Sequence, residues 1–203
     1  MTAPEDVRRT HDDDLRRAVA VVASLNLAYF GVEFTVAAAI GSVSLFADSV
    51  DFLEDASINL LILTALGWSA AARARVGMAL SAILLVPGLA TLWTAWQKFN
   101  APMPPAPLAL SLTGLGALAV NLACALLLAR FRRRAGSLSR AAFLSARNDA
   151  AANVAIVAAG LVTAWTLSAW PDLIVGLAIA LMNAGAAREV FEAARRERRE
   201  AEP

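Results

Sequence analysis

The sequence predicts an all-α, polytopic membrane protein with six transmembrane helices and both termini in the cytoplasm. Three observations support this fold class: an excess of apolar residues, six separate apolar stretches, and basic residues gathered on one side. Hydrophobic residues make up 59% of the 203 positions, whereas soluble domains have roughly 45–50%. The net charge is only +1, so the composition does not indicate a nucleic-acid partner.

Six stretches are long enough to cross a bilayer, because a helical span needs roughly 20 apolar residues. They are separated by five short segments: Gly41-Ser42, the arginines near position 75, the prolines after position 101, a second arginine-rich stretch and Trp170-Pro171. The predicted spans are residues 18–40, 44–67, 76–97, 108–130, 141–166 and 172–190.

The distribution of basic residues predicts the orientation. In a six-span chain, one side of the membrane receives every Lys and Arg except Lys98, and cytoplasmic loops are the ones enriched in these residues. Residues 1–17 are therefore expected to form a cytoplasmic N-terminal segment, residues 18–190 the transmembrane domain, and residues 191–203 a short cytoplasmic tail. The predicted location is the cell's inner, or plasma, membrane, with lipid around the helices.

Acidic residues crowd into the second predicted span. An acid at the centre of a span costs about 2.5–3.5 kcal/mol, and this span carries Asp48, Asp51, Glu54 and Asp55. At 100° per residue, the three aspartates and Asn59 fall within about 80° of one another. This stripe is expected to face the interior of the bundle, with Glu54 to its side.

The fifth span repeats the pattern, because Ser145, Asp149 and Asn153 stand four residues apart with Asn148 beside them. No buried basic residue can neutralise Asp51, Asp55 and Asp149 together, so a cation from outside the chain is the simplest partner.

Other intramembrane polar residues have structural interpretations. Asp48 lies near the outer end of its span, where it could cap the helix or be solvated, and Asp172 suits the N-terminus of the last span. Interhelical hydrogen bonds are expected for Asn26, Asn59, Asn121 and Asn183. Cys124 is expected to be a small buried apolar residue.

These residues resemble a known family. The sequence runs that carry the resemblance are 26–33, 41–45, 47–55, 147–153 and 170–172. They are similar to the first two and last two spans of the cation diffusion facilitators, and the likeness covers about residues 20–190. The resemblance implies a secondary transporter, not an enzyme, that moves divalent metals out of the cytoplasm in exchange for protons.

In this family the transport site takes two residues from the second span and two from the fifth. The resemblance therefore implies Asp51, Asp55, Asp149 and Ser145 as metal ligands. The weaker candidates are Asn148, Asp48 and Glu54.

Two departures from the family pattern affect the expected substrate and assembly. Ser145 stands where the family usually has histidine, and the only histidine, His11, lies outside the predicted spans. Oxygen ligands suit manganese or magnesium, with iron and cobalt between, although zinc and cadmium stay candidates.

No organic cofactor is expected. The family's usual cytoplasmic domain, which often supports the dimer, is expected to be missing; a homodimer is still predicted, through the small residues of the third and fourth spans.

Three other functions are alternatives to metal transport. A carrier of a non-metal cation would need an aromatic cage around the cation, whereas the tryptophans lie mostly at span edges. A membrane-embedded enzyme would need a catalytic pair with a nucleophile. A structural partner subunit would use the acids to bind a neighbouring chain.

Overall fold

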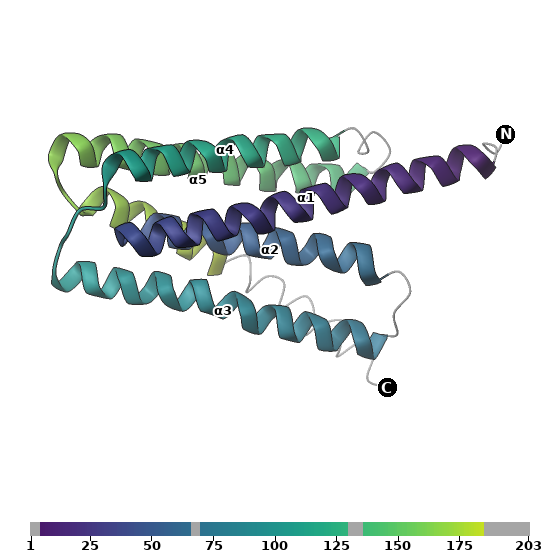
Figure 1. Ribbon diagram of the computed structural model, residues 1–203, viewed down its shortest axis with the longest axis horizontal. Helices are drawn as coiled ribbons and strands as arrows, with labels where there is room; N and C mark the ends of the chain where they lie inside the picture. The colour runs from purple at the N-terminus through teal and green to yellow at the C-terminus, as the bar shows by residue number, and fades with distance from the viewer. Residues whose placement is uncertain (1–4, 66–69, 130–135, 185–203) are drawn as a thin grey trace.

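A computed structural model describes residues 5–65, 70–129 and 136–184 of the chain, and all regular structure in these ranges is helical (Figure 1). The predicted all-α class is therefore confirmed. The helices are α1 (Glu5–Ile40), α2 (Val43–Ala65), α3 (Ala70–Asn100), α4 (Pro107–Ala129), α5 (Gly136–Thr166) and a shorter helix, Trp170–Ala184. The predicted tail, residues 191–203, lies outside the described residues.

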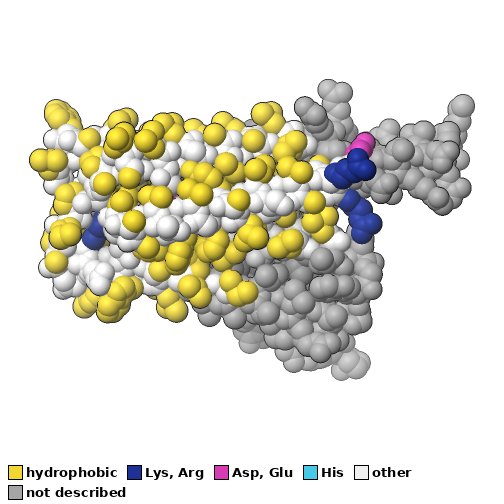
Figure 2. All heavy atoms as spheres, viewed as in Figure 1, with side chains coloured by type: hydrophobic (Ala, Val, Ile, Leu, Met, Phe, Trp, Pro, Cys, Tyr) yellow, Lys and Arg dark blue, Asp and Glu magenta, His cyan; other side chains and the backbone are white. Residues whose placement is uncertain are grey.

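Three helical segments are long and apolar enough to cross a membrane by length and composition. They are Arg16–Ile40, Pro107–Ala129 and Asn148–Thr166. The helix α2 also has sufficient length, with 23 residues or about 34 Å, but its four acids lower its hydropathy. Figure 2 shows hydrophobic side chains over most of the described surface on this face, as expected for a lipid-facing bundle.

The first helix begins earlier than predicted. Its 36 residues extend about 54 Å, well beyond the roughly 30 Å of a hydrocarbon core. The charged segment before Arg16 contains no glycine or proline from Glu5 onward, so nothing in its sequence ends the helix. The charged end of α1 therefore extends past the rest of the bundle (Figure 1).

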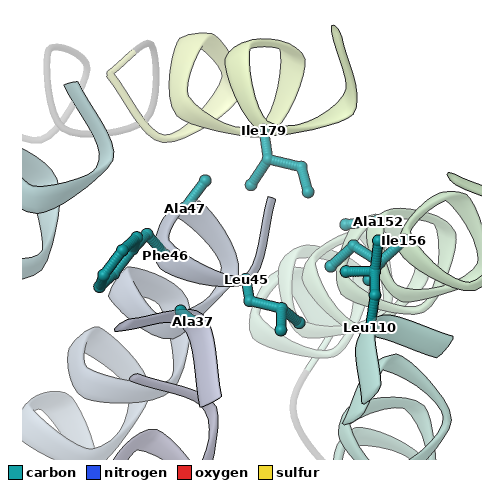
Figure 3. Close-up of a cluster of buried hydrophobic side chains, with 8 residues drawn as sticks. All are labelled: Ala37, Leu45, Phe46, Ala47, Leu110, Ala152, Ile156 and Ile179. Carbon is teal, nitrogen blue, oxygen red and sulfur yellow. The ribbon is translucent and has the colours of Figure 1, made fainter. Parts of the chain in front are cut away.

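One apolar cluster joins both halves of the chain (Figure 3). Its central residues are Leu45 of α2, Leu110 of α4 and Ile156 of α5, each 0% exposed. The full cluster comprises Ala37, Leu45, Phe46, Ala47, Leu110, Ala152, Ile156 and Ile179. This packing holds α2 against α5 and against the Trp170–Ala184 helix, the three elements that carry the candidate site.

The connection between α1 and α2 is the tight turn that Gly41-Ser42 predicted. Gly41 has a φ of 63°, a left-handed conformation that glycine adopts without steric cost. Ser42 then caps α2, because its hydroxyl accepts a hydrogen bond from the amide of Leu45 at 3.2 Å. The turn places the N-terminus of α2 beside the Trp170–Ala184 helix.

Gly176 allows that close approach. A Cβ atom built on Gly176 would lie 2.6 Å from the backbone nitrogen of Ser44 and from the carbonyl carbon of Val43. Backbone atoms at a helix start cannot move aside as a flexible side chain can. The absence of a side chain at Gly176 is therefore required for the Trp170–Ala184 helix to contact α2.

We expect Gly176→Ala to lower the free energy of unfolding by about 1–3 kcal/mol, the usual cost of overpacking. Gly31→Ala is the matched control, since a Cβ there meets nothing within 4 Å and alanine favours a helix. Denaturant titration in detergent, followed by circular dichroism, measures both variants. Equal stability of the two would show that the helices are not held this closely.

Candidate cation site

Acidic and amide side chains of three helices line one cavity of about 200 Å³. The cavity lies between α2, α5 and the Trp170–Ala184 helix. Its lining residues are Asp51, Glu54, Asp55, Ile58, Asn148, Asp149, Met182 and Asn183. The three aspartates predicted as metal ligands therefore face a common space, although they come from positions almost 100 residues apart.

The helical repeat explains why α2 supplies most of the acids. Asp51, Asp55 and Ile58 are spaced by four and three residues, which places them on one face of the helix. Glu54 is adjacent to Asp55 and also reaches the cavity. The side chains of Asp51 and Asp55 are only partly exposed, so these acids line a recess of the bundle.

The charge of this cavity is negative. Asp51 interacts electrostatically with Asp149 and with Asp55, and Asp149 interacts with both Asp55 and Glu54. None of the described residues that line the cavity is basic. Like charges this close in a low-dielectric interior repel one another, so the cavity favours a cation that neutralises them.

The described acids do not form a compact set of metal ligands. Among the residues that the structure describes, no three side chains of His, Cys, Asp or Glu are grouped closely enough to hold one metal ion. The carboxylates instead line a cavity of about 200 Å³.

The remaining predicted ligands differ in their positions. Asn148 and Glu54 both line the cavity. The side chain of Ser145 lies outside the described residues, so its proposed role stays a prediction. Asn183, which was expected only to join helices, lines the cavity and also donates a hydrogen bond to the carbonyl oxygen of Ala47 at 3.2 Å.

Asp48 is not solvated, contrary to one of the two structural interpretations of its position. It is 1% exposed, and its Oδ2 accepts a hydrogen bond from Asn153 at 2.7 Å. Asn153 in turn accepts one from Asn121 at 3.0 Å, so Asn121 does join two helices as predicted. Asp48 lies one turn nearer the start of α2 than Asp51 and belongs to an adjoining buried polar layer.

Asp172 is structural, as predicted, but the N-terminus that it stabilises is that of α2. Its carboxylate accepts hydrogen bonds from the amides of Val43 at 2.9 Å and Ser44 at 3.2 Å. It also forms an ion pair with Lys98 at 2.6 Å, in which the two side chains are 0% and 6% exposed. The sequence predicted only that Lys98 lies on the outer side of the membrane, and it did not predict this partner.

A larger hollow, of about 750 Å³, lies near Trp93, Trp96 and Met103. Its lining includes Lys98 and contains no carboxylate among the described residues. It therefore lacks the negative charge that a metal cation requires.

A helical bundle with an acid-lined cavity and apolar outer faces defines a membrane protein that handles cations. The family model of the cation efflux transmembrane domain matches residues 19–197. The chain therefore belongs to the cation efflux family, whose members are transporters of divalent metal cations and not enzymes. No curated protein matches the chain.

Proposed function

We propose that this protein exports a divalent metal ion from the cytoplasm in exchange for protons, with Asp51, Asp55 and Asp149 as the transport ligands. The observation that carries the proposal is the shared cavity, which collects these three carboxylates from α2 and α5 and has no basic residue in the described part of its lining. Among the residues that the structure describes, no aromatic side chain lines it, so the cage expected for a non-metal cation carrier is not favoured.

The donor atoms support harder ions over zinc. Carboxylate and amide oxygens line the cavity, with the thioether of Met182 as the one sulfur among its described lining residues, and such oxygen sets suit manganese, iron or cobalt. Zinc sites usually include histidine or cysteine. We therefore propose manganese, iron or cobalt as preferred substrates, with zinc and cadmium as weaker ones.

Proton exchange follows from the chemistry of the ligands. A carboxylate must be deprotonated to bind metal, so protons and metal compete for the same oxygens. The three carboxylates repel one another, and their protonation states are therefore coupled. Reprotonation from the outside would expel metal, and rocking of helices around the site would expose it alternately to each face.

We further propose a homodimer in the inner membrane, with both termini cytoplasmic.

Uptake into proteoliposomes with an imposed proton gradient tests the function. Manganese, iron, cobalt, zinc, cadmium and magnesium are supplied singly, and internal metal is measured for the wild type, Asp55→Ala and the control Asp14→Asn, which changes an exposed acid outside the cavity. We expect saturable, gradient-driven uptake that is lost only in Asp55→Ala. A folded wild-type protein that transports none of these ions would contradict the proposal.

Selectivity gives a second prediction. Ser145→His would introduce the nitrogen ligand that the family pattern usually has at this position, and zinc binds imidazole more readily than manganese does. We expect the ratio of zinc to manganese uptake to rise by about tenfold, which corresponds to about 1.4 kcal/mol. The control is Ser145→Ala, and an unchanged ratio in the histidine variant would show that position 145 does not contact the ion.

A further inference from the structure

Glu33 is a fully buried acid without a hydrogen-bond partner. It lies on α1, is 0% exposed, and neither of its carboxylate oxygens has a partner among the described residues. A buried carboxylate without a partner is costly, and such groups normally pair with a base, a hydrogen-bond donor or a metal. Glu33 therefore requires a compensating group that the neighbouring side chains do not supply.

Asp48 of α2 interacts electrostatically with Glu33, and more strongly than Asp51 does. The two acids lie on the packed helices α1 and α2. Both are acceptors when ionised, so their interaction satisfies neither unless a positive species lies between them. The approach of α1 to α2 thus brings together two acids that share one unmet requirement.

Three described polar groups of the bundle are engaged elsewhere. Asn153 donates to Asp48 Oδ2 at 2.7 Å, which fixes that carboxylate without supplying a donor to Glu33. Tyr29, one turn before Glu33, donates its hydroxyl to the carbonyl oxygen of Thr113 at 2.5 Å. Lys98, the described buried base, is paired with Asp172.

We propose that Glu33 and Asp48 form a second cation site, which receives a divalent metal ion from the acid-lined cavity. A proton between the two acids would neutralise one charge, whereas a divalent ion neutralises both and can engage more than one oxygen of each. The inference rests on the proposed function, because it assigns the same class of ion to both sites.

Asp51 connects the two sites. It lines the cavity and interacts electrostatically with both Glu33 and Asp48. Asp48 lies three residues nearer the α1–α2 turn than Asp51, or about 4.5 Å along the helix. An ion that leaves the cavity toward that end of the bundle therefore meets the Glu33–Asp48 pair next.

Binding of manganese to the purified full-length protein in detergent tests the second site. Equilibrium dialysis with manganese chloride is compared for the wild type, Asp55→Ala, Glu33→Gln and the double variant. We expect each single variant to bind one ion fewer per chain than the wild type. We expect the residual manganese affinity of Asp55→Ala to fall by more than about 100-fold when Glu33→Gln is added, because loss of even an outer-shell partner costs 10–100-fold.

The outcomes separate this inference from the proposed function. If Glu33→Gln binds as many ions as the wild type, the pair holds a proton and the second site is overturned. If Asp55→Ala alone removes all bound manganese, the second site is overturned while the cavity site stands. If Asp55→Ala binds like the wild type, the proposed function fails at its own site.

Misfolding does not obscure this test. Glu33→Gln keeps the shape of the side chain and removes a buried charge, so its thermal midpoint without metal is expected to equal or exceed that of the wild type. Asp48→Asn is the second variant and is expected to lose the same ion. Manganese should raise the thermal midpoint less in either variant than in the wild type.

Discussion

Lys98→Met is expected to lower the free energy of unfolding by about 3–5 kcal/mol, the usual cost of breaking a buried ion pair by removing one partner. Lys98 and Asp172 are joined at 2.6 Å with almost no exposure. Methionine preserves much of the apolar stem of lysine, so the loss comes mainly from the charge left on Asp172. That carboxylate also caps α2, so the start of the helix that carries the cavity acids is expected to loosen.

Unfolding of the detergent-solubilised protein measures this effect, with Gln97→Met as the matched control because Gln97 is the exposed neighbour of Lys98 on α3. The double variant Lys98→Met, Asp172→Asn removes both charges and keeps oxygen for the amides of Val43 and Ser44. It should recover part of the lost stability. A loss below about 1 kcal/mol in the single variant would place this ion pair with solvated surface pairs.

The helical architecture could be predicted from the sequence because each feature is local. Apolar length, glycine and proline breaks and the turn at Gly41 depend on neighbouring residues, and within the described residues the structure has helices where the six spans were expected. The end of α1 could not be predicted in the same way. Hydropathy marks where a helix leaves lipid, whereas the helix itself continues back to Glu5 because nothing in the charged segment ends it.

The candidate site was partly predictable for the same reason. Helical periodicity identified the stripe of Asp51 and Asp55, and the absence of a buried base near Asp149 indicated an external cation. Periodicity on one helix does not determine which residue of another helix it meets. The contributions of Asn183 and Met182 to the cavity, and the interaction of Glu33 with Asp48, depend on interhelical packing and were not predicted.

The ion pair of Lys98 with Asp172 shows this limit clearly. The sequence placed Lys98 on the outer side of the membrane, where a lysine at the end of a span normally extends toward water, and no partner for it was predicted. The pair forms because the Trp170–Ala184 helix packs against the turn before α2, which Gly176 permits at close range. Two residues 74 positions apart become partners through contacts that neither local sequence contains.

Asp55→Asn is expected to reduce metal uptake by at least about 100-fold. Asparagine has nearly the same volume as aspartate, so the cavity keeps its shape while it loses one of its carboxylates. An amide oxygen is a weaker ligand than a carboxylate, and loss of an outer-shell partner alone costs 10–100-fold. A direct ligand should cost more. The remaining acids would also bind fewer compensating protons, which weakens the coupling of transport to the proton gradient.

Initial rates of manganese uptake in proteoliposomes, at equal protein content and with intact folding shown by circular dichroism, measure this loss. Glu54→Gln is the graded control, because Glu54 lines the same cavity but lies to the side of the Asp51–Asp55 stripe. It is expected to lower uptake by less than about tenfold, since it changes the cavity's charge but not its main ligands. If Asp55→Asn transported manganese within about twofold of the wild type while Glu54→Gln lost transport, the ligands on α2 would have to be reassigned to the neighbouring face of the helix.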